Sequence, residues 1–122
     1  NIPIDVFKQN IGPAEAITKY LKENEGMSYS EIAKLIGRDQ RTVWVNYSNA
    51  SRKIKDKIVV KDNIFVPSSV LADRRLSILE SVVVYLRGKG MKNAEVAALL
   101  GKDPRNIWTL YSRAVRKLGR QK

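Results

Sequence analysis

The chain has 122 residues, 43% of them hydrophobic, which suffices for one ordinary domain or two very small ones with a packed core. It contains no Cys and no His, which excludes disulfide bonds and thiolate chemistry and removes the usual zinc ligands and the commonest general base. Lys and Arg number 23 against 12 Asp and Glu, a net charge of +11. A small chain this basic attracts polyanions at long range. Binding of a polyanion therefore explains the excess positive charge better than a merely solubilising surface does.

Two further exclusions concern membranes. No apolar run is long enough to span a bilayer, and no signal peptide is visible. An anionic membrane surface is a weaker partner than nucleic acid, because the basic residues are scattered and do not form one stripe. The chain begins with Asn1 and not with Met, which allows for a piece of a longer protein.

An internal repeat organises the sequence. Residues 26–53 align with residues 90–117 without gaps at an offset of 64, and 14 of these 28 positions are identical. After a one-residue slip the similarity extends upstream, where Tyr20-Leu21 meets Tyr85-Leu86. Half identity over such a stretch indicates a duplication. We therefore predict two units, residues 1–61 and 62–122.

Each unit begins with two predicted helices. A short helix is expected after Pro3, and again after Pro67. The second helix starts with Pro13, a residue that suits the first turn because its missing N–H would have no partner there. At the same place in the second unit, Ser77 and Glu80 form a capping-box pattern.

The third and fourth helices form a helix-turn-helix pair. Ser28 and Glu31 cap the third helix, and the small Ala33 lets the next helix approach closely. Gly37 ends this helix through a left-handed turn, and Asp39 is a good N-cap for the fourth. The second unit repeats the device with Ala97, Gly101, Asp103 and Pro104. The expected fold is all-α: two tandem helix-turn-helix units of about four short helices each.

The units are joined by residues 57–66, which are rich in β-branched residues and include a turn-like Asp62-Asn63. This composition predicts an extended linker or a small hairpin.

The fourth helix of each unit has two distinct faces. At 100° per residue, Val43, Tyr47 and Ala50 share a core stripe, and an outward face of Arg and small residues lies opposite. Such a face suits the major groove, because Arg can bond guanine or phosphate and small residues permit close approach. The outward positions are Arg41, Val45, Ser48 and Arg52 in the first unit, and Arg105, Thr109, Ser112 and Arg116 in the second.

Cations also stand where this helix begins. Arg38 and Arg41, like Lys102 and Arg105, lie at a helix N-terminus, which the helix dipole makes a poor place for positive charge. A docked DNA phosphate would explain them better than solvation alone. The basic side chains after the helix, namely Lys53, Lys55, Lys57, Lys117 and Arg120, either are solvated or touch backbone phosphates. Trp44 and Trp108 fall at the border of the core stripe, where partial packing against a neighbouring helix is the favoured interpretation.

Residues 37–54 resemble the region-four helix-turn-helix of bacterial sigma factors, and Arg113-Ala-Val-Arg-Lys-Leu118 is similar to the end of that family's recognition helix. The resemblance covers about 25 residues of each unit. It implies that the fourth helix enters the major groove of promoter DNA. The positions it turns toward DNA are Gln40, Arg41, Thr42, Trp44, Val45, Pro104, Arg105, Asn106, Trp108 and Thr109.

The chain also departs from that family. No sigma region two is visible, and two region-four-like units in tandem are not the sigma arrangement. Asn46 stands where the family has an apolar residue, whereas the second unit keeps Leu110. The first unit is therefore expected to pack more loosely or to have another role.

Sequence-specific binding of double-stranded DNA, by a transcriptional regulator or its DNA-binding part, is the leading hypothesis. RNA polymerase or another protein is a further partner to consider, and the alternative function is a protein-interaction adaptor. An enzyme is the least favoured class, because most acidic residues serve as helix caps. No catalytic residue, metal, cofactor, small-molecule ligand or membrane contact is expected. The expected location is the cytoplasm, in association with the nucleoid. The candidate DNA-binding residues are Arg38, Gln40, Arg41, Thr42, Val45, Ser48, Arg52, Lys102, Arg105, Asn106, Thr109, Ser112 and Arg116.

Overall fold

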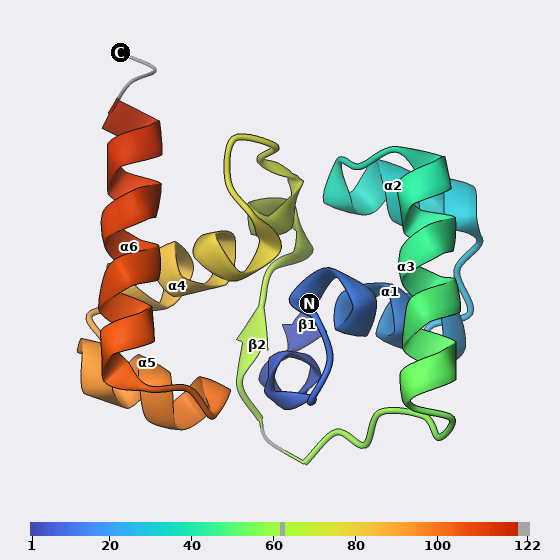
Figure 1. Cartoon of the computed structure of the whole chain (residues 1–122), viewed down its shortest axis with the longest axis horizontal. Helices are drawn as coiled ribbons and strands as arrows, with labels where there is room; N and C mark the ends of the chain where they lie inside the picture. Colours follow the sequence, from blue (N-terminus) through green and yellow to red (C-terminus); the bar gives the residue numbers. More distant parts are fainter. Residues whose placement is uncertain (62, 120–122) are drawn as a thin grey trace.

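The computed structural model describes residues 1–61 and 63–119 and is mostly helical (Figure 1). The first half contains β1 (Ile2–Pro3), the 3-10 helix η1 (Ile4–Lys8), α1 (Pro13–Glu23), α2 (Tyr29–Ile36) and α3 (Gln40–Lys53). The second half follows the same order with β2 (Phe65–Val66), the 3-10 helix η2 (Ser68–Ala72), α4 (Ile78–Gly88), α5 (Asn93–Leu100) and α6 (Pro104–Gly119). The predicted all-α class is confirmed.

The predicted helix ends are found where their capping residues stand. The Ser28 hydroxyl accepts a hydrogen bond from the Glu31 N–H at 3.1 Å, and the Ser28 N–H donates to Oε1 of Glu31 at 2.9 Å. Ser77 and Glu80 make the same two bonds at 3.1 and 2.9 Å. Gly37 closes α2 with a φ of 65°. This is a left-handed conformation that glycine adopts without steric cost.

The hydrophobic core runs through both halves of the chain. Each half contributes buried residues at corresponding positions of its helices, so neither half has to bury its apolar faces alone. Three completely buried residues of the first half have completely buried equivalents in the second: Ile17, Ile32 and Val43 correspond to Val82, Val96 and Ile107.

The N-terminal segments of the two halves connect them. β1 pairs with β2 in antiparallel register, with Ile2 opposite Val66 and Pro3 opposite Phe65. The 3-10 helix η1 packs on α1 and on α5, whereas η2 packs on α4 and on α2. Each 3-10 helix therefore contacts a helix of the other half.

The connection between the halves is extended and contributes β2 at its end. The hairpin alternative is wrong, because β2 pairs with β1 from the other end of the first half and not with a neighbouring strand of the linker. Within the predicted turn, Asp62 lies outside the described residues, as does Arg120 of the basic cluster. The division of the chain at residues 61 and 62 stays a prediction.

Helices α3 and α6 occupy opposite sides of the molecule. In Figure 1, α3 descends at the right while α6 rises at the left, so the two helices run in opposite directions. Both pass in front of the helices on which they pack, so they lie toward the same face of the molecule.

Candidate nucleic-acid interface

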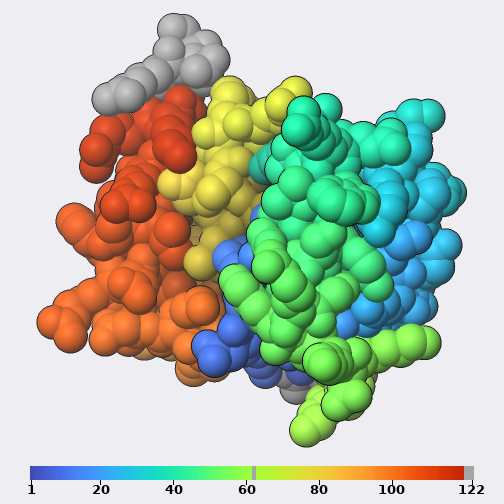
Figure 2. All heavy atoms as spheres, turned by 45° about the vertical axis from the view of Figure 1, so that its right-hand side comes forward, coloured from blue at the N-terminus to red at the C-terminus, as the bar shows by residue number. Residues whose placement is uncertain are grey.

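The beginning of α3 is turned toward solvent. Val43 and Ala50, seven residues apart and thus on one side of the helix, are completely buried where α3 packs on α1 and α2. The opposite side carries Arg41 and Val45, both exposed. Gln40, Thr42 and Trp44 are exposed as well. In Figure 2 the green atoms of α3 stand at the front of the molecule, where no other element covers them.

Helix α6 repeats this arrangement. Ile107 and Ala114 are buried, as Val43 and Ala50 are in α3. The first two turns of α6 are exposed at Pro104, Arg105, Asn106, Trp108 and Thr109. The side chains that the resemblance to sigma region four turns toward DNA are thus all accessible, on α3 as well as on α6.

Trp44 and Trp108 lie in solvent, with exposed fractions of 54% and 62%. The interpretation that they are partly core is wrong. Each follows a buried residue, Val43 or Ile107, and its side chain points about 100° away from the core stripe. More than half of each tryptophan is therefore accessible, close along the helix to Arg41 or Arg105.

The arginine in the first turn of each helix is free to meet a ligand. The side chain of Arg105 is 93% exposed, and its Nε atom lies 3.5 Å from Oδ1 of Asp103. Asp103 in turn caps α6 by accepting a hydrogen bond from the Arg105 N–H at 2.8 Å. Arg41 is exposed, and its side chain makes no ion pair or hydrogen bond within residues 1–61 and 63–119. An exposed surface ion pair is weak, so both guanidinium groups are available to an anion.

The later outward positions are less prominent. Ser48 and Ser112 are half-buried, whereas Arg52 and Arg116 are exposed. The Arg52 guanidinium donates to Oδ1 of Asn49, one turn earlier on the same helix. Of these later positions, the two arginines are therefore accessible, and the two serines are only partly so.

Arg38 does not join this surface. Its guanidinium donates to the carbonyl oxygen of Ile36 at 2.9 Å and to that of Leu76, in the other half, at 3.0 Å. Burial lowers the pKa of the Arg38 side chain, and Arg74 nearby adds to the effect. Its position in the sequence, at a helix N-terminus, did not reveal these carbonyl partners. The structure gives Arg38 a part in holding the two halves together.

A basic side chain that is not among the predicted DNA-binding residues lies next to them on α6. Arg113 lines a shallow hollow of about 320 Å³ together with Lys102, Asn106 and Thr109. Arg113 is exposed and Lys102 half-buried. The signal that could have found Arg113 is its spacing, because it lies four residues after Thr109 and therefore on the same side of the helix.

The lysines that end α3 and α6 are paired with carboxylates. Nζ of Lys53 lies 2.9 Å from Oε1 of Glu15, and Nζ of Lys117 lies 2.7 Å from Oε1 of Glu80. Both carboxylates belong to the first turn of the preceding long helix, α1 or α4. These two lysines therefore join the ends of α3 and α6 to the beginnings of α1 and α4.

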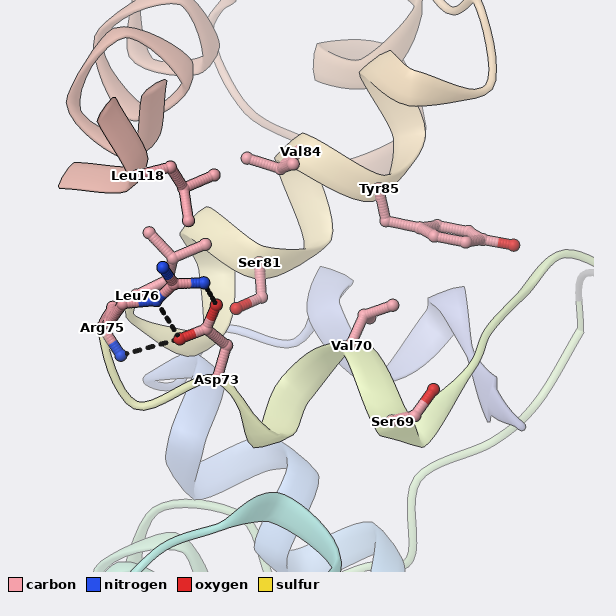
Figure 3. A pocket seen from close by; sticks show the side chains of 9 residues that line it. All are labelled: Ser69, Val70, Asp73, Arg75, Leu76, Ser81, Val84, Tyr85 and Leu118. Carbon is pink, nitrogen blue, oxygen red and sulfur yellow. Dashed lines mark hydrogen bonds and ion pairs between the residues drawn. The ribbon is translucent and has the colours of Figure 1, made fainter. Parts of the chain in front are cut away.

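A second hollow, of about 370 Å³, is formed by η2, α4 and the end of α6 (Figure 3). Its charged groups satisfy each other: Nη2 of Arg75 lies 2.7 Å from Oδ2 of Asp73, and Nε lies 3.0 Å from Oδ1.

In the described part of the chain, no three His, Cys, Asp or Glu residues gather as metal ligands would. No helix among these residues is long and apolar enough to cross a membrane.

Comparison with known families supports the helix-turn-helix geometry. Residues 74–118 match the family model described as Sigma-70, region 4. This segment covers α4, α5 and nearly all of α6, so the second half of the chain contains a helix-turn-helix module of the sigma region-four kind, a DNA-binding class of domain. Searches of curated proteins and of solved structures found no match.

Proposed function

We propose that this protein binds double-stranded DNA sequence-specifically through two helix-turn-helix units, with α3 and α6 entering the major groove. The observation that carries the proposal is the matched exposure of Arg41 with Trp44 and of Arg105 with Trp108 at the beginning of the two helices. Arginine bonds guanine edges or phosphate, and a net charge of +11 favours association with a polyanion. Such a protein is a transcriptional regulator or the DNA-binding part of one.

Position on the helix supports specific contact. The first two turns of a recognition helix are the part that meets base edges in helix-turn-helix complexes. In α6, those turns carry Arg105, Asn106 and Thr109, and in α3 they carry Arg41, Thr42 and Val45, all of them exposed. Each set combines a cation with small side chains that allow close approach to the bases.

A protein-interaction adaptor is the second candidate. The exposed Trp44, Val45 and Trp108 favour it, because tryptophan is enriched at protein interfaces. RNA polymerase belongs among the partners to test under this proposal, given the region-four resemblance of the second half. The two functions differ in what the arginines do, since an adaptor surface built on tryptophan has no need of two accessible guanidinium groups.

The test compares two charge-matched double variants in binding to a mixed-sequence duplex. Arg41→Ala with Arg105→Ala is expected to weaken binding by roughly 2 kcal/mol or more, because each good arginine contact contributes about 1–3 kcal/mol. Lys61→Ala with Lys89→Ala removes the same charge from exposed positions outside α3 and α6, and a much smaller loss is expected. Equal losses in the two variants would mean that charge alone, and not these helices, attracts DNA.

A further inference from the structure

The two halves are arranged about an approximate twofold axis. The repeat offset is 64, and Ile2 pairs with Val66, which is the residue at its own position in the other half. In an antiparallel pair, a residue can stand opposite its own equivalent only where a twofold axis passes between the two strands. Ile2 and Val66 are both buried, so this axis lies in the core of the molecule.

Contacts away from the strands obey the same symmetry. The packing of η1 on α5 has its counterpart in the packing of η2 on α2. The beginnings of α1 and α4 also meet, and Pro13 and Ala14 line one hollow together with Ile78 and Leu79, their equivalents at the slipped offset of 65. Reciprocal contacts of this kind are those of an isologous dimer, here within one chain.

The axis relates the two candidate DNA-binding helices. In Figure 1, which looks down the shortest axis of the molecule, α3 and α6 run in opposite directions on opposite sides and lie toward the viewer. Double-helical DNA has its own local twofold axes, and a twofold protein places its recognition helices on half-sites that are inverted with respect to each other.

The relation between the halves is held by specific contacts and not only by the linker. The Arg38 guanidinium donates to the Leu76 carbonyl oxygen across the boundary at 3.0 Å. Gly37 lies so close to η2 that a Cβ added there would be 2.6 Å from the Ala72 carbonyl oxygen. A fixed relation between α3 and α6 requires a fixed distance between the two half-sites.

We propose that the DNA target is an imperfect inverted repeat, with two related but unequal half-sites at one preferred spacing. This inference rests on the proposed function. The half-sites are related because Arg41 and Arg105 occupy equivalent positions and favour guanine. They are unequal because Asn106, suited to adenine, replaces Thr42, and Thr109 replaces Val45, whose side chain suits a thymine methyl group.

The experiment begins with selection of bound duplexes from a random-sequence pool by the intact chain. The two half-sites of the selected sequence are then arranged as inverted, direct and everted repeats, and the spacing is varied in single base pairs over one helical turn. The inverted repeat is expected to bind roughly 100-fold more tightly than the other two arrangements, because they prevent one helix from docking while the other is bound. A shift of about 5 base pairs from the best spacing is expected to abolish this advantage, since it turns one half-site to the far side of the duplex.

A double variant tests the inequality of the half-sites. Thr42→Asn with Val45→Thr makes the outward face of α3 match α6 at those positions, and it is expected to shift the preference toward a more perfect palindrome. Selection of direct repeats, or equal affinity for one half-site and two, would overturn the inference while leaving DNA binding intact. Failure to bind any duplex would instead refute the proposed function.

Discussion

The Nζ atom of Lys117, near the end of α6, lies 2.7 Å from Oε1 of Glu80, whose side chain is only 3% exposed. The same carboxylate oxygen accepts the Ser77 N–H at 2.9 Å, so one buried group both caps α4 and anchors α6. Burial would raise the pKa of Glu80, but the Lys117 ammonium and the bonds with Ser77 outweigh it and hold this pKa below its usual value of about 4.5. This pair joins the end of α6 to the beginning of α4.

The Glu80–Lys117 pair predicts a pH-dependent contribution to stability. Because the folded-state pKa is depressed, the contribution is present above about pH 4.5 and is lost as the pH falls through the folded-state value. Lys117→Met is expected to cost about 1–2 kcal/mol of unfolding free energy at pH 7 and clearly less at pH 3, measured by urea denaturation. Lys53→Met is the matched control, with a smaller loss because Glu15 and Lys53 are both more exposed. A loss from Lys117→Met that is the same at both pH values would contradict this role.

Gly37 and Gly101 form a matched pair that reports on the boundary between the halves. Both have a left-handed φ, 65° and 67°, so replacement by Ala costs roughly 1–2 kcal/mol at either position. Only at Gly37 would the new Cβ collide, with the Ala72 carbonyl oxygen; at Gly101 nothing lies within 4 Å. Gly37→Ala is expected to lose at least about 1 kcal/mol more than Gly101→Ala in denaturant unfolding. Equal losses would mean that α2 and η2 do not pack as described.

Arg38 and Lys102 occupy equivalent positions in the repeat but have different surroundings. Arg38→Ala is expected to destabilise the fold by about 1–2 kcal/mol, because it removes charge-assisted bonds to buried carbonyl groups. Lys102→Ala is expected to leave stability nearly unchanged and to lower the salt dependence of DNA binding by about one phosphate contact. Thermal unfolding and salt-dependent binding of both variants check this pair. The reverse outcome, with Arg38→Ala affecting only binding, would return Arg38 to the DNA surface.

The two exposed tryptophans provide separate signals from the two helices. Trp44→Phe leaves only Trp108, and Trp108→Phe leaves only Trp44. If both helices dock, DNA is expected to protect each remaining tryptophan from acrylamide quenching, because both are more than half exposed in the free protein. Protection of Trp108 alone would show that only the second half binds DNA.

Local features of the fold were predictable from the sequence because they depend on neighbouring residues. Ser28 with Glu31 and Ser77 with Glu80 cap their helices, and Gly37 ends α2, since each device acts within a few residues. The alignment of the repeat also gave the correct order of the helices. These features follow from hydrogen bonding and backbone sterics within one turn.

Long-range relationships could not be predicted in this way. The pairing of Ile2 with Val66 joins residues far apart in the chain, and no local pattern specifies it. Arg38 looked like a phosphate ligand because its carbonyl partner on Leu76 belongs to the other half. The exposure of Trp44 depends on how far α1 and α2 reach, which periodicity alone does not reveal.

The measurement that most directly tests DNA binding through both α3 and α6 is the salt dependence of duplex affinity for the intact chain, for Arg41→Ala and for Arg105→Ala. Two docked helices contacting on the order of six phosphates predict a log–log slope of about −5, and each single variant is expected to lower the affinity. The contradicting result is an intact chain with no measurable affinity for duplex DNA even at low salt. The exposed tryptophans would then point to a protein partner.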